Sequence, residues 1–296
     1  MQAPVLAFDI GGTKLAAGLS TTPGSLEQIL SCPTPATDGT QIIPQLIKLG
    51  KELLGDRQPA AIGVAAAGQI NIETGIVHYA SDTIRNWQGL NITGPLEQAF
   101  SCRVAVDNDV NAMALAEHQF GVAQNCTNVV FVAVGTGVGG ALILNRTLHH
   151  GRTWSGGELC HLQVNFDDDR VCPCGDTGHL EAYTAGPAME RRYGREGIRL
   201  TEIAARAEQG EAQAQAVITE GARILGRSLA GVMTLLDPDM LVIGGGVSNL
   251  GEIWWSPLLE ALRNNHVPGP AAVVIKKAQF GSDAVLVGAT CLAARP

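Results

Sequence analysis

A pattern of strand, glycine-rich turn and strand occurs twice in this sequence, and it restricts the possible folds more than any other feature. In the first copy, residues 11–13 join two short apolar runs, the second of which spans 15–20. In the second copy, the glycine-rich stretch 135–140 joins apolar runs over 128–134 and 141–145. Short apolar runs that flank glycine are typical of strands joined by tight turns. The sequence therefore predicts two α/β units that each open with a hairpin.

Helical and strand patterns complete the first unit. Residues 26–31 continue the hairpin as a third strand, and residues 42–54 place their apolar side chains at helical spacing. Residues 61–66 are typical of a short buried strand. A strand over 104–107 then leads into a helix over 110–121. These elements make one complete α/β unit.

The second unit continues with a strand that starts at Met240 and ends in the glycines 244–246, before a helical run over 253–264. The long run 211–236 has a continuous apolar face that core packing explains. In the first unit, the stretch 69–87 is polar and shows no periodicity, so we expect a loop there. Long loops in compact domains are usually functional.

Charge and hydropathy exclude several classes of function. The formal net charge is -8 at pH 7, and the chain has no basic run of the kind that binds phosphate backbones. We therefore expect no nucleic acid partner. No apolar run approaches the roughly 18 residues that span a bilayer, and the N-terminus has no signal-peptide pattern. We expect a cytoplasmic protein without a membrane partner.

Acidic and amide side chains gather in the stretch 107–111, between the predicted strand and helix. Burying an unpaired carboxylate is costly, so these side chains should face solvent or a ligand. A carboxylate near a helix N-terminus is held ionised by unpaired amides and the macrodipole, which suits a residue that accepts a proton. Asp107 or Asp109 could equally be a helix cap, and this stretch alone does not decide between the two roles.

The first glycine turn carries Asp9, Thr13 and Lys14. Glycine lets backbone amides approach an anion, Thr13 and Lys14 can contact phosphate, and Asp9 is placed to act on a metal ion. An ordinary hairpin turn is the alternative, because glycine is common in turns. Glycine clusters also follow the strands that end near residues 134 and 243. Together the clusters suggest loops around one polyphosphate-bearing ligand.

Histidine and cysteine side chains within residues 161–179 offer a set of nitrogen and sulfur ligands that suits tetrahedral zinc. The ligands are His161, Cys172, Cys174 and His179. Gly175 and Gly178 allow the chain to bend around one ion. The other histidines lack partners at ligand spacing, and we expect them at the surface or in hydrogen bonds: His78, His118, His149, His150 and His266.

Several motifs, in their order and spacing, resemble the ROK family of sugar kinases. They are Asp9-Ile-Gly-Gly-Thr-Lys14, Asn108-Asp109, the glycine-rich stretch 135–140, Gly157-Glu158-Leu-Cys-His161, the segment 172–181 and the glycines 244–246. The resemblance runs over nearly the whole chain. It implies an α/β, two-domain actin/hexokinase-like (ribonuclease H-like) ATPase fold with a zinc-binding insertion.

The resemblance also implies domain boundaries. An N-terminal α/β domain would span residues 1–120, and the C-terminal helix 284–296 would fold back to join it. A C-terminal α/β domain would span 121–283 and carry the zinc-binding segment 158–181. We further expect a homo-oligomer, either a dimer or a tetramer.

Individual residues take roles from the same resemblance. Asp109 would be the catalytic base that removes a proton from the sugar hydroxyl. Substrate-binding residues would be Gly68, Asn108, Asp109, Glu158, His161 and Glu181. Residues for ATP and its Mg²⁺ would be Asp9, Gly11, Gly12, Thr13, Lys14, Thr136, Gly137, Gly245 and Gly246. The metal ligands are again His161, Cys172, Cys174 and His179, and the zinc would be structural. The family usually has Cys where this chain has His179, and Gly where it has Cys160.

The resemblance implies an ATP-dependent kinase that transfers the γ-phosphoryl group to a hexose hydroxyl. Glucose is the first candidate, because glucokinases are the commonest activity in the family, and N-acetylmannosamine or N-acetylglucosamine is the alternative. Gln69 and the segment 81–87, including Ser81, would shape the choice of sugar. A sugar-responsive transcriptional regulator is the alternative of another class. Such regulators place a DNA-binding module before the first strand, where this sequence has only residues 1–4.

Overall fold

The computed structural model describes residues 3–80, 83–166, 169–264 and 267–294, so Ser81 and His266 lie outside the described residues. The chain forms two compact units. Unit 1 contains residues 1–125, 148–156 and 279–296, and unit 2 contains 126–147 and 157–278. The sequence placed residues 121–125, 148–156 and 279–283 in the second domain, whereas the structure groups them with unit 1.

Unit 1 is built on a sheet with the strand order β3-β2-β1-β4-β7. The first three strands are antiparallel neighbours, and β4 pairs parallel with both β1 and β7. The strands are β1 (Val5–Ile10), β2 (Lys14–Ser20), β3 (Gln28–Pro33), β4 (Ala61–Ala66) and β7 (Val104–Asn108). Because β1, β4 and β7 are parallel, their carboxyl ends lie at one edge of the sheet, the edge where α/β proteins usually bind ligands.

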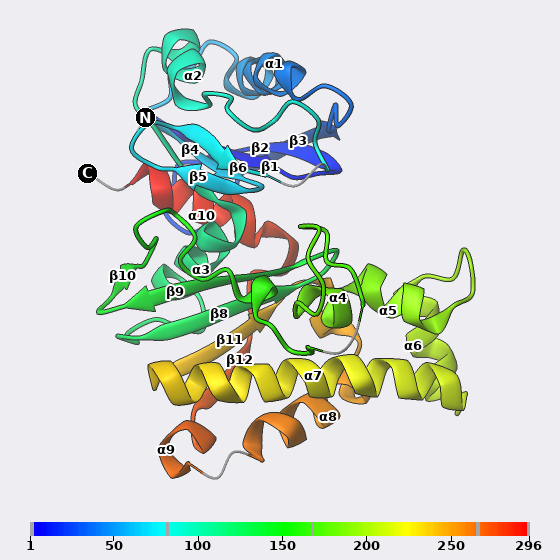
Figure 1. Cartoon of the computed structure of the whole chain (residues 1–296). Helices are drawn as coiled ribbons and strands as arrows, with labels where there is room; N and C mark the ends of the chain where they lie inside the picture. The colour runs from blue at the N-terminus through cyan, green and yellow to red at the C-terminus, as the bar shows by residue number, and fades with distance from the viewer. Residues whose placement is uncertain (1–2, 81–82, 167–168, 265–266, 295–296) are drawn as a thin grey trace. The chain divides into compact units, whose positions relative to one another are not determined.

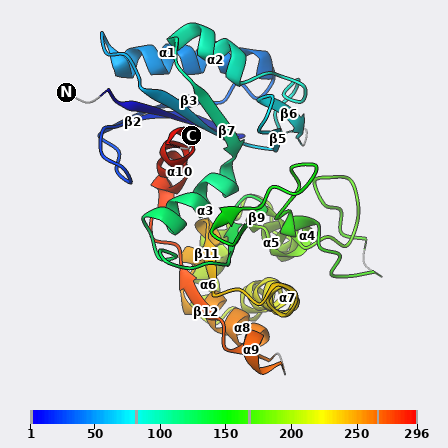
Figure 2. The same cartoon turned by 90° about the vertical axis from the view of Figure 1, so that its left-hand side faces the viewer.

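Helices cover both faces of this sheet. Figures 1 and 2 show α1 (Ile42–Leu54) and α2 (Thr93–Phe100) on one face, and α3 (Asp109–Gln119) with α10 (Ala284–Ala293) on the other. Helix α10 packs very close to the sheet: a Cβ at Gly63 on β4 would overlap the carbonyl group of Ala289 on α10. The last helix of the chain therefore completes the core that the first strands begin.

Unit 2 repeats the plan with the strand order β10-β9-β8-β11-β12. Strands β8 and β9 are antiparallel, and β11 pairs parallel with β8 and β12. The strands are β8 (Val129–Val134), β9 (Val138–Leu144), β10 (Thr147–Leu148), β11 (Met240–Gly244) and β12 (Val274–Lys277). The predicted repeat of two strands joined by a glycine-rich turn is confirmed.

The helices of unit 2 pack into one apolar core with this sheet. The long helix α7 lies beside α8, as Figure 1 shows in yellow and orange. The helices are α4 (Glu181–Thr184), α5 (Gly186–Tyr193), α6 (Leu200–Glu208), α7 (Ala212–Leu236), α8 (Glu252–Arg263) and α9 (Pro268–Ala271). Short 3-10 helices are η1 (Gly39–Gln41), η2 (Leu159–His161), η3 (Gly246–Asn249) and η4 (Gly281–Asp283). Across the described ranges, no helix combines the length and apolar character needed to cross a membrane.

Two expectations about local structure were wrong. The stretch 69–87 was expected to be a loop, but it contains the antiparallel strands β5 (Gln69–Asn71) and β6 (Ile76–Tyr79). Both strands are too short for a periodic pattern to show in the sequence. The second strand of the unit 2 hairpin was expected to start at Ala141, but β9 starts at Val138, inside the glycine-rich stretch.

Candidate active site

Two acidic residues of unit 1 lie in one register across the parallel strands. Asp9 on β1 is opposite Ala65 on β4, and Ala65 is opposite Asp107 on β7. The residues that follow these strands reach the same edge of the sheet. The Nδ2 amide of Asn108 donates to the carbonyl oxygen of Gly68 at 3.0 Å. The structure thus brings together Gly68 and Asn108, which are far apart in the sequence.

Asn108 caps helix α3. Its side-chain oxygen accepts hydrogen bonds from the amides of Val110, at 2.8 Å, and Asn111, at 3.2 Å. Asp109 is the first residue of the helix, and its carboxylate also accepts from the Val110 amide, at 2.9 Å. The cap is therefore Asn108, and not Asp107 or Asp109, which the sequence analysis had offered for this role. The Asp109 carboxylate lies in the first turn of the helix, where the unpaired amides and the helix dipole are positive.

Asp9 and Asp109 are electrostatically coupled. Burial, and then the negative charge of Asp109, raise the pKa of Asp9 to about 7, while the Lys14 ammonium opposes the shift. Two carboxylates in one partly buried place repel each other unless a proton or a cation offsets their charge. This arrangement is typical of a site that binds a divalent cation or takes up protons.

The turn between β1 and β2 presents backbone amides. The Gly11 amide donates to the carbonyl of Lys14 at 3.1 Å and closes the turn. Among the described residues, no hydrogen bond is made by the amides of Gly12 and Thr13. Unused amides in a tight turn, next to the exposed Lys14, form an environment that suits phosphate oxygens.

In unit 2, a second glycine turn joins β8 to β9, and Glu181 lies against it. The Glu181 carboxylate accepts from the Val138 amide at 2.7 Å, and a Cβ at Gly137 would come within 2.8 Å of the same oxygen. Burial raises the pKa of the Glu181 carboxyl, and the Val138 bond opposes the shift. Thr136 is exposed at the tip of the turn. Glu181 therefore supports the turn, and its predicted contact with sugar stays a prediction.

The glycines after β11 approach the same turn. Gly245 has a φ of 84°, and a Cβ there would overlap the backbone of Val134 at the end of β8. Only glycine fits this position without strain. The predicted phosphate and adenosine residues Gly137, Gly245 and Gly246 therefore lie at one edge of the sheet of unit 2.

A potential metal site lies in the segment before α4. The ligand atoms of four side chains all lie within 4.8 Å of one another: His161, Cys172, Cys174 and His179. Cys174 Sγ is 3.3 Å from His179 Nδ1, and the two histidine Nδ1 atoms are 3.5 Å apart. Such separations match the edges of a tetrahedron with zinc at its centre, given Zn–N of about 2.0 Å and Zn–S of about 2.3 Å. The residues that the sequence selected fit a zinc ion.

The His161 ring connects the potential metal site to Glu158. Its Nδ1 points toward His179, while its Nε2 is 3.9 Å from the Glu158 carboxylate. The buried Cys160 thiol donates to the same carboxylate at 3.2 Å. Glu158, Cys160 and His161 also form a smaller cluster of possible ligands. Burial, and then Glu158, raise the pKa of the Cys160 thiol, which keeps it protonated and able to donate.

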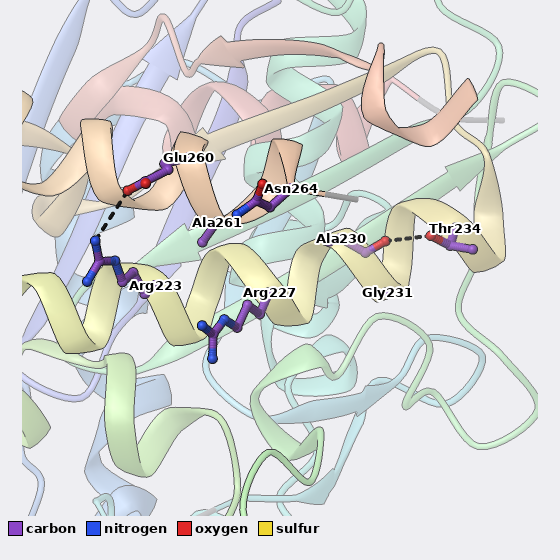
Figure 3. Close-up of a pocket in the computed structure, with 8 residues that line it drawn as sticks. All are labelled: Arg223, Arg227, Ala230, Gly231, Thr234, Glu260, Ala261 and Asn264. Atoms are coloured by element: carbon purple, nitrogen blue, oxygen red, sulfur yellow. Dashed lines mark hydrogen bonds and ion pairs between the residues drawn. The ribbon is translucent and has the colours of Figure 1, made fainter. Parts of the chain in front are cut away.

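A hollow of about 610 Å³ on unit 2 is separate from these residues. Figure 3 shows it between α7 and α8, with the Arg223–Glu260 ion pair at one end and the bond from Thr234 to the Ala230 carbonyl at the other. None of the predicted site residues lines it. Glu260, its one lining carboxylate, is paired with Arg223, so the hollow has no free base for the deprotonation of a hydroxyl.

One contact of the acidic stretch was missed by the sequence analysis. His150, expected at the surface or in a hydrogen bond, lies 2.7 Å from the Asp107 carboxylate through its Nε2 atom. The two residues are separated by 43 positions and share no local motif, so only the fold could reveal the pair.

Comparisons with known proteins agree with this geometry. The chain is 31% identical to a glucokinase of Streptomyces coelicolor over 320 residues, covering 98% of both chains. It is 31% identical to an N-acetyl-D-glucosamine kinase of Salmonella paratyphi B over 300 residues, covering 96% of this chain and 97% of the other. The structure matches a ROK family glucokinase from Streptomyces griseus in complex with glucose and AMPPNP, with a TM-score of 0.84, 30% identity and coverage of 98% and 99%.

These matches confirm the predicted α/β hexokinase-like fold over the whole chain. The ROK family pattern extends over residues 5–295, so it takes in both glycine turns, the acidic stretch and the histidine and cysteine ligands. The resemblance seen in the sequence motifs is therefore confirmed, and the chain belongs to the ROK family.

Proposed function

We propose that this protein is an ATP-dependent sugar kinase that transfers the γ-phosphoryl group of ATP to a hexose hydroxyl, with glucose as the first candidate. The observation that carries the proposal is the coupled pair Asp9 and Asp109, at the sheet edge where the turn 11–14 presents unused amides. Phosphoryl transfer requires positioned groups, a cation and an oriented nucleophile more than covalent chemistry by the protein.

The acidic residues of unit 1 have separate roles in this mechanism. Asp109 accepts the proton of the attacking sugar hydroxyl, and the adjacent Asn108 binds a sugar hydroxyl next to Gly68. Asp9 and Lys14 face the nucleotide, and Asp9 is the residue that would hold its Mg²⁺. When bound there, Mg²⁺ would supply positive charge that offsets the charge of the phosphates and of the acidic side chains. The amides of Gly12 and Thr13, with Gly11 closing their turn, bind phosphate oxygens.

The glycine turns of unit 2 hold the rest of the nucleotide. Thr136 and Gly137 contact phosphate, and Gly245 and Gly246 lie against the adenosine. Glu158, His161 and Glu181 bind sugar hydroxyls. The last of these also carries the bond to the Val138 amide, so one carboxylate links the sugar contact to the phosphate turn.

We infer that zinc bound by His161, Cys172, Cys174 and His179 is structural. The His161 ring would be fixed as a ligand of this ion, and its Nε2, which is 3.9 Å from the Glu158 carboxylate, would be the atom that faces a sugar hydroxyl or Glu158. The four ligands leave no open coordination position for a substrate, which is typical of structural zinc.

The second candidate substrate is N-acetylglucosamine, because an N-acetyl-D-glucosamine kinase is as similar to this chain as the glucokinase is. N-acetylmannosamine remains the further alternative. We propose that Gln69 and the segment 81–87 distinguish these sugars. We also propose a homo-oligomer, which size-exclusion chromatography with light scattering would test.

A coupled assay of ADP release tests the function. The purified chain, with Mg²⁺ and ATP, would be offered glucose, mannose, fructose, N-acetylglucosamine and N-acetylmannosamine. We expect the highest kcat/KM with glucose. A preference for an N-acetylhexosamine would change the substrate, and no ADP release above the sugar-free control with any of the five would reject the kinase proposal.

A further inference from the structure

The segment 148–156 belongs to unit 1, although the chain on both sides of it belongs to unit 2. Its side chains contact several parts of unit 1. Ser155 donates to Gln69 on β5 at 3.3 Å, and the Trp154 ring lies edge-on to His78 on β6, with centroids 5.4 Å apart. His150 reaches Asp107 at the end of β7.

The contact with Asp107 is the most buried of these. The Asp107 side chain is 3% exposed and that of His150 is 15% exposed. One Asp107 oxygen accepts from the Asn108 amide and from Asn111 Nδ2, each at 2.8 Å, and the other lies 2.7 Å from His150 Nε2. At this distance an N–H at Nε2 donates to the carboxylate oxygen, which accepts. Hydrogen bonds to a charged acceptor are among the strongest in proteins.

The backbone of the segment fixes where the His150 side chain points. The Gly156 amide donates to the carbonyl of His150 at 2.8 Å, which closes residues 150–156 into a loop. A Cβ at Gly156 would come within 2.5 Å of the carbonyl oxygen of His149, so the loop is too tight for another residue there. His150 is therefore held at both its backbone and its side chain.

Along the chain, both members of the pair are close to residues of the proposed site. Asp107 directly precedes Asn108, which caps α3, and Asp109, the proposed base. Along the chain, the loop around His150 is followed at once by Gly157 and Glu158. A change at His150 therefore removes a contact next to the turn that presents the proposed base.

We propose that His150 is a positioning residue for phosphoryl transfer. Through Asp107 it fixes the turn of Asn108 and Asp109, and it anchors the segment 148–156 on unit 1. This inference rests on the proposed kinase function. Without His150, one oxygen of a buried carboxylate loses its donor, and the turn shifts to find another. Small displacements of reacting groups are costly, since about 1 Å can slow a reaction about 100-fold.

Kinetics of three variants test the inference. His150→Ala removes the donor, and His150→Gln restores one, because the Gln amide nitrogen occupies the place of Nε2. His149→Ala is the matched control, because His149 is exposed on the same segment. We expect His150→Ala to lower kcat about 10- to 100-fold and to raise the sugar KM, with little change in the KM for ATP. His150→Gln should recover most of the loss, and His149→Ala should match the wild type.

Hydrogen exchange gives a readout that does not depend on activity. In the full chain without ligands, His150→Ala should speed amide exchange in residues 108–111 and 148–156, and His150→Gln should not. If the wild type phosphorylates no sugar, the kinase proposal fails while this comparison still tests the anchor. Wild-type kcat and sugar KM in His150→Ala, unchanged exchange, or a His150→Gln variant as impaired as His150→Ala would each overturn the inference.

Discussion

Asp109 is one residue from the helix cap, and this position allows a clean test of its chemistry. Asp109→Asn keeps the shape of the side chain and an oxygen for the Val110 amide, so the fold and nucleotide binding should be retained. Loss of the proton acceptor should slow turnover by about 10²- to 10⁴-fold, the usual contribution of a general base. Steady-state kinetics and nucleotide titration measure the two effects. Near wild-type turnover would make Asp109 a structural residue or a sugar ligand.

Asp9 should make stability without ligands depend on pH. Its folded pKa of about 7 lies above the 3.8 of an unperturbed aspartate, so the folded state holds the proton more tightly. The resulting stability is fully present below pH 3.8 and is lost as the pH rises to about 7. Asp9→Asn cannot titrate, so its free energy of unfolding relative to the wild type should rise by roughly 3 to 4 kcal/mol from pH 4 to pH 8. Urea unfolding at both pH values measures the change.

Asp239 supplies a control of opposite sign. It accepts hydrogen bonds from the amides of Asn128 and Thr127, which lower the pKa of its carboxyl. The stability that these bonds contribute is present above the pKa of Asp239 in the unfolded chain. It is lost as the pH falls through the pKa of Asp239 in the folded state. Asp239→Asn should therefore be destabilised most near neutral pH, and its deficit should shrink as the pH falls. Parallel pH trends in the two variants would contradict the assigned cause.

At the scale of elements, the sequence predicted those helices and strands that a local pattern of apolar residues marks. Helix α1 and strand β4 have the predicted bounds, because the apolar residues of α1 keep helical spacing up to Gly55, and the apolar run of β4 lies between Pro59 and Gly68. Strands β5 and β6 and helix α2 were missed, because each is short and its packing partners lie elsewhere in the chain. The bond between His150 and Asp107 was also missed, because the two residues are 43 positions apart in the sequence. The potential zinc ligands were found because they lie within one segment.

That segment, residues 158–181, provides a prediction of its own. His179→Ala should lower the zinc content from about one ion per chain and raise the sugar KM before it affects the KM for ATP, because His161 loses its fixed orientation. Thermal stability should fall as well, since metal binding contributes folding free energy. Elemental analysis and saturation kinetics measure these effects.

His179→Cys is the matched variant, because a thiolate replaces the imidazole as a ligand. It should keep both metal and activity. A metal-free wild type with full activity would reject the zinc site. A His179→Ala variant with bound metal and unchanged sugar affinity would place the fourth ligand elsewhere, with Cys160 the first residue to test, because it belongs to the neighbouring cluster.

At the scale of the whole molecule, unit 1 is assembled from three separate parts of the chain, and α10 brings in the last of them. Helix α10 packs on α3 so closely that a Cβ at Gly288 would overlap the carbonyl oxygen of Ala112. Gly288→Ala should therefore destabilise the protein by about 1 to 3 kcal/mol, the usual cost of overpacking.

Gly231 on α7 is exposed, and a Cβ there meets nothing within 4 Å. Gly231→Ala should stabilise by about 0.5 to 1 kcal/mol, from helix propensity alone. Because both changes are the same glycine to alanine exchange within a helix, the difference in their free energies of unfolding isolates the packing of α10 on unit 1. Equal stabilisation of the two variants would show that the chain's last helix is not held against α3.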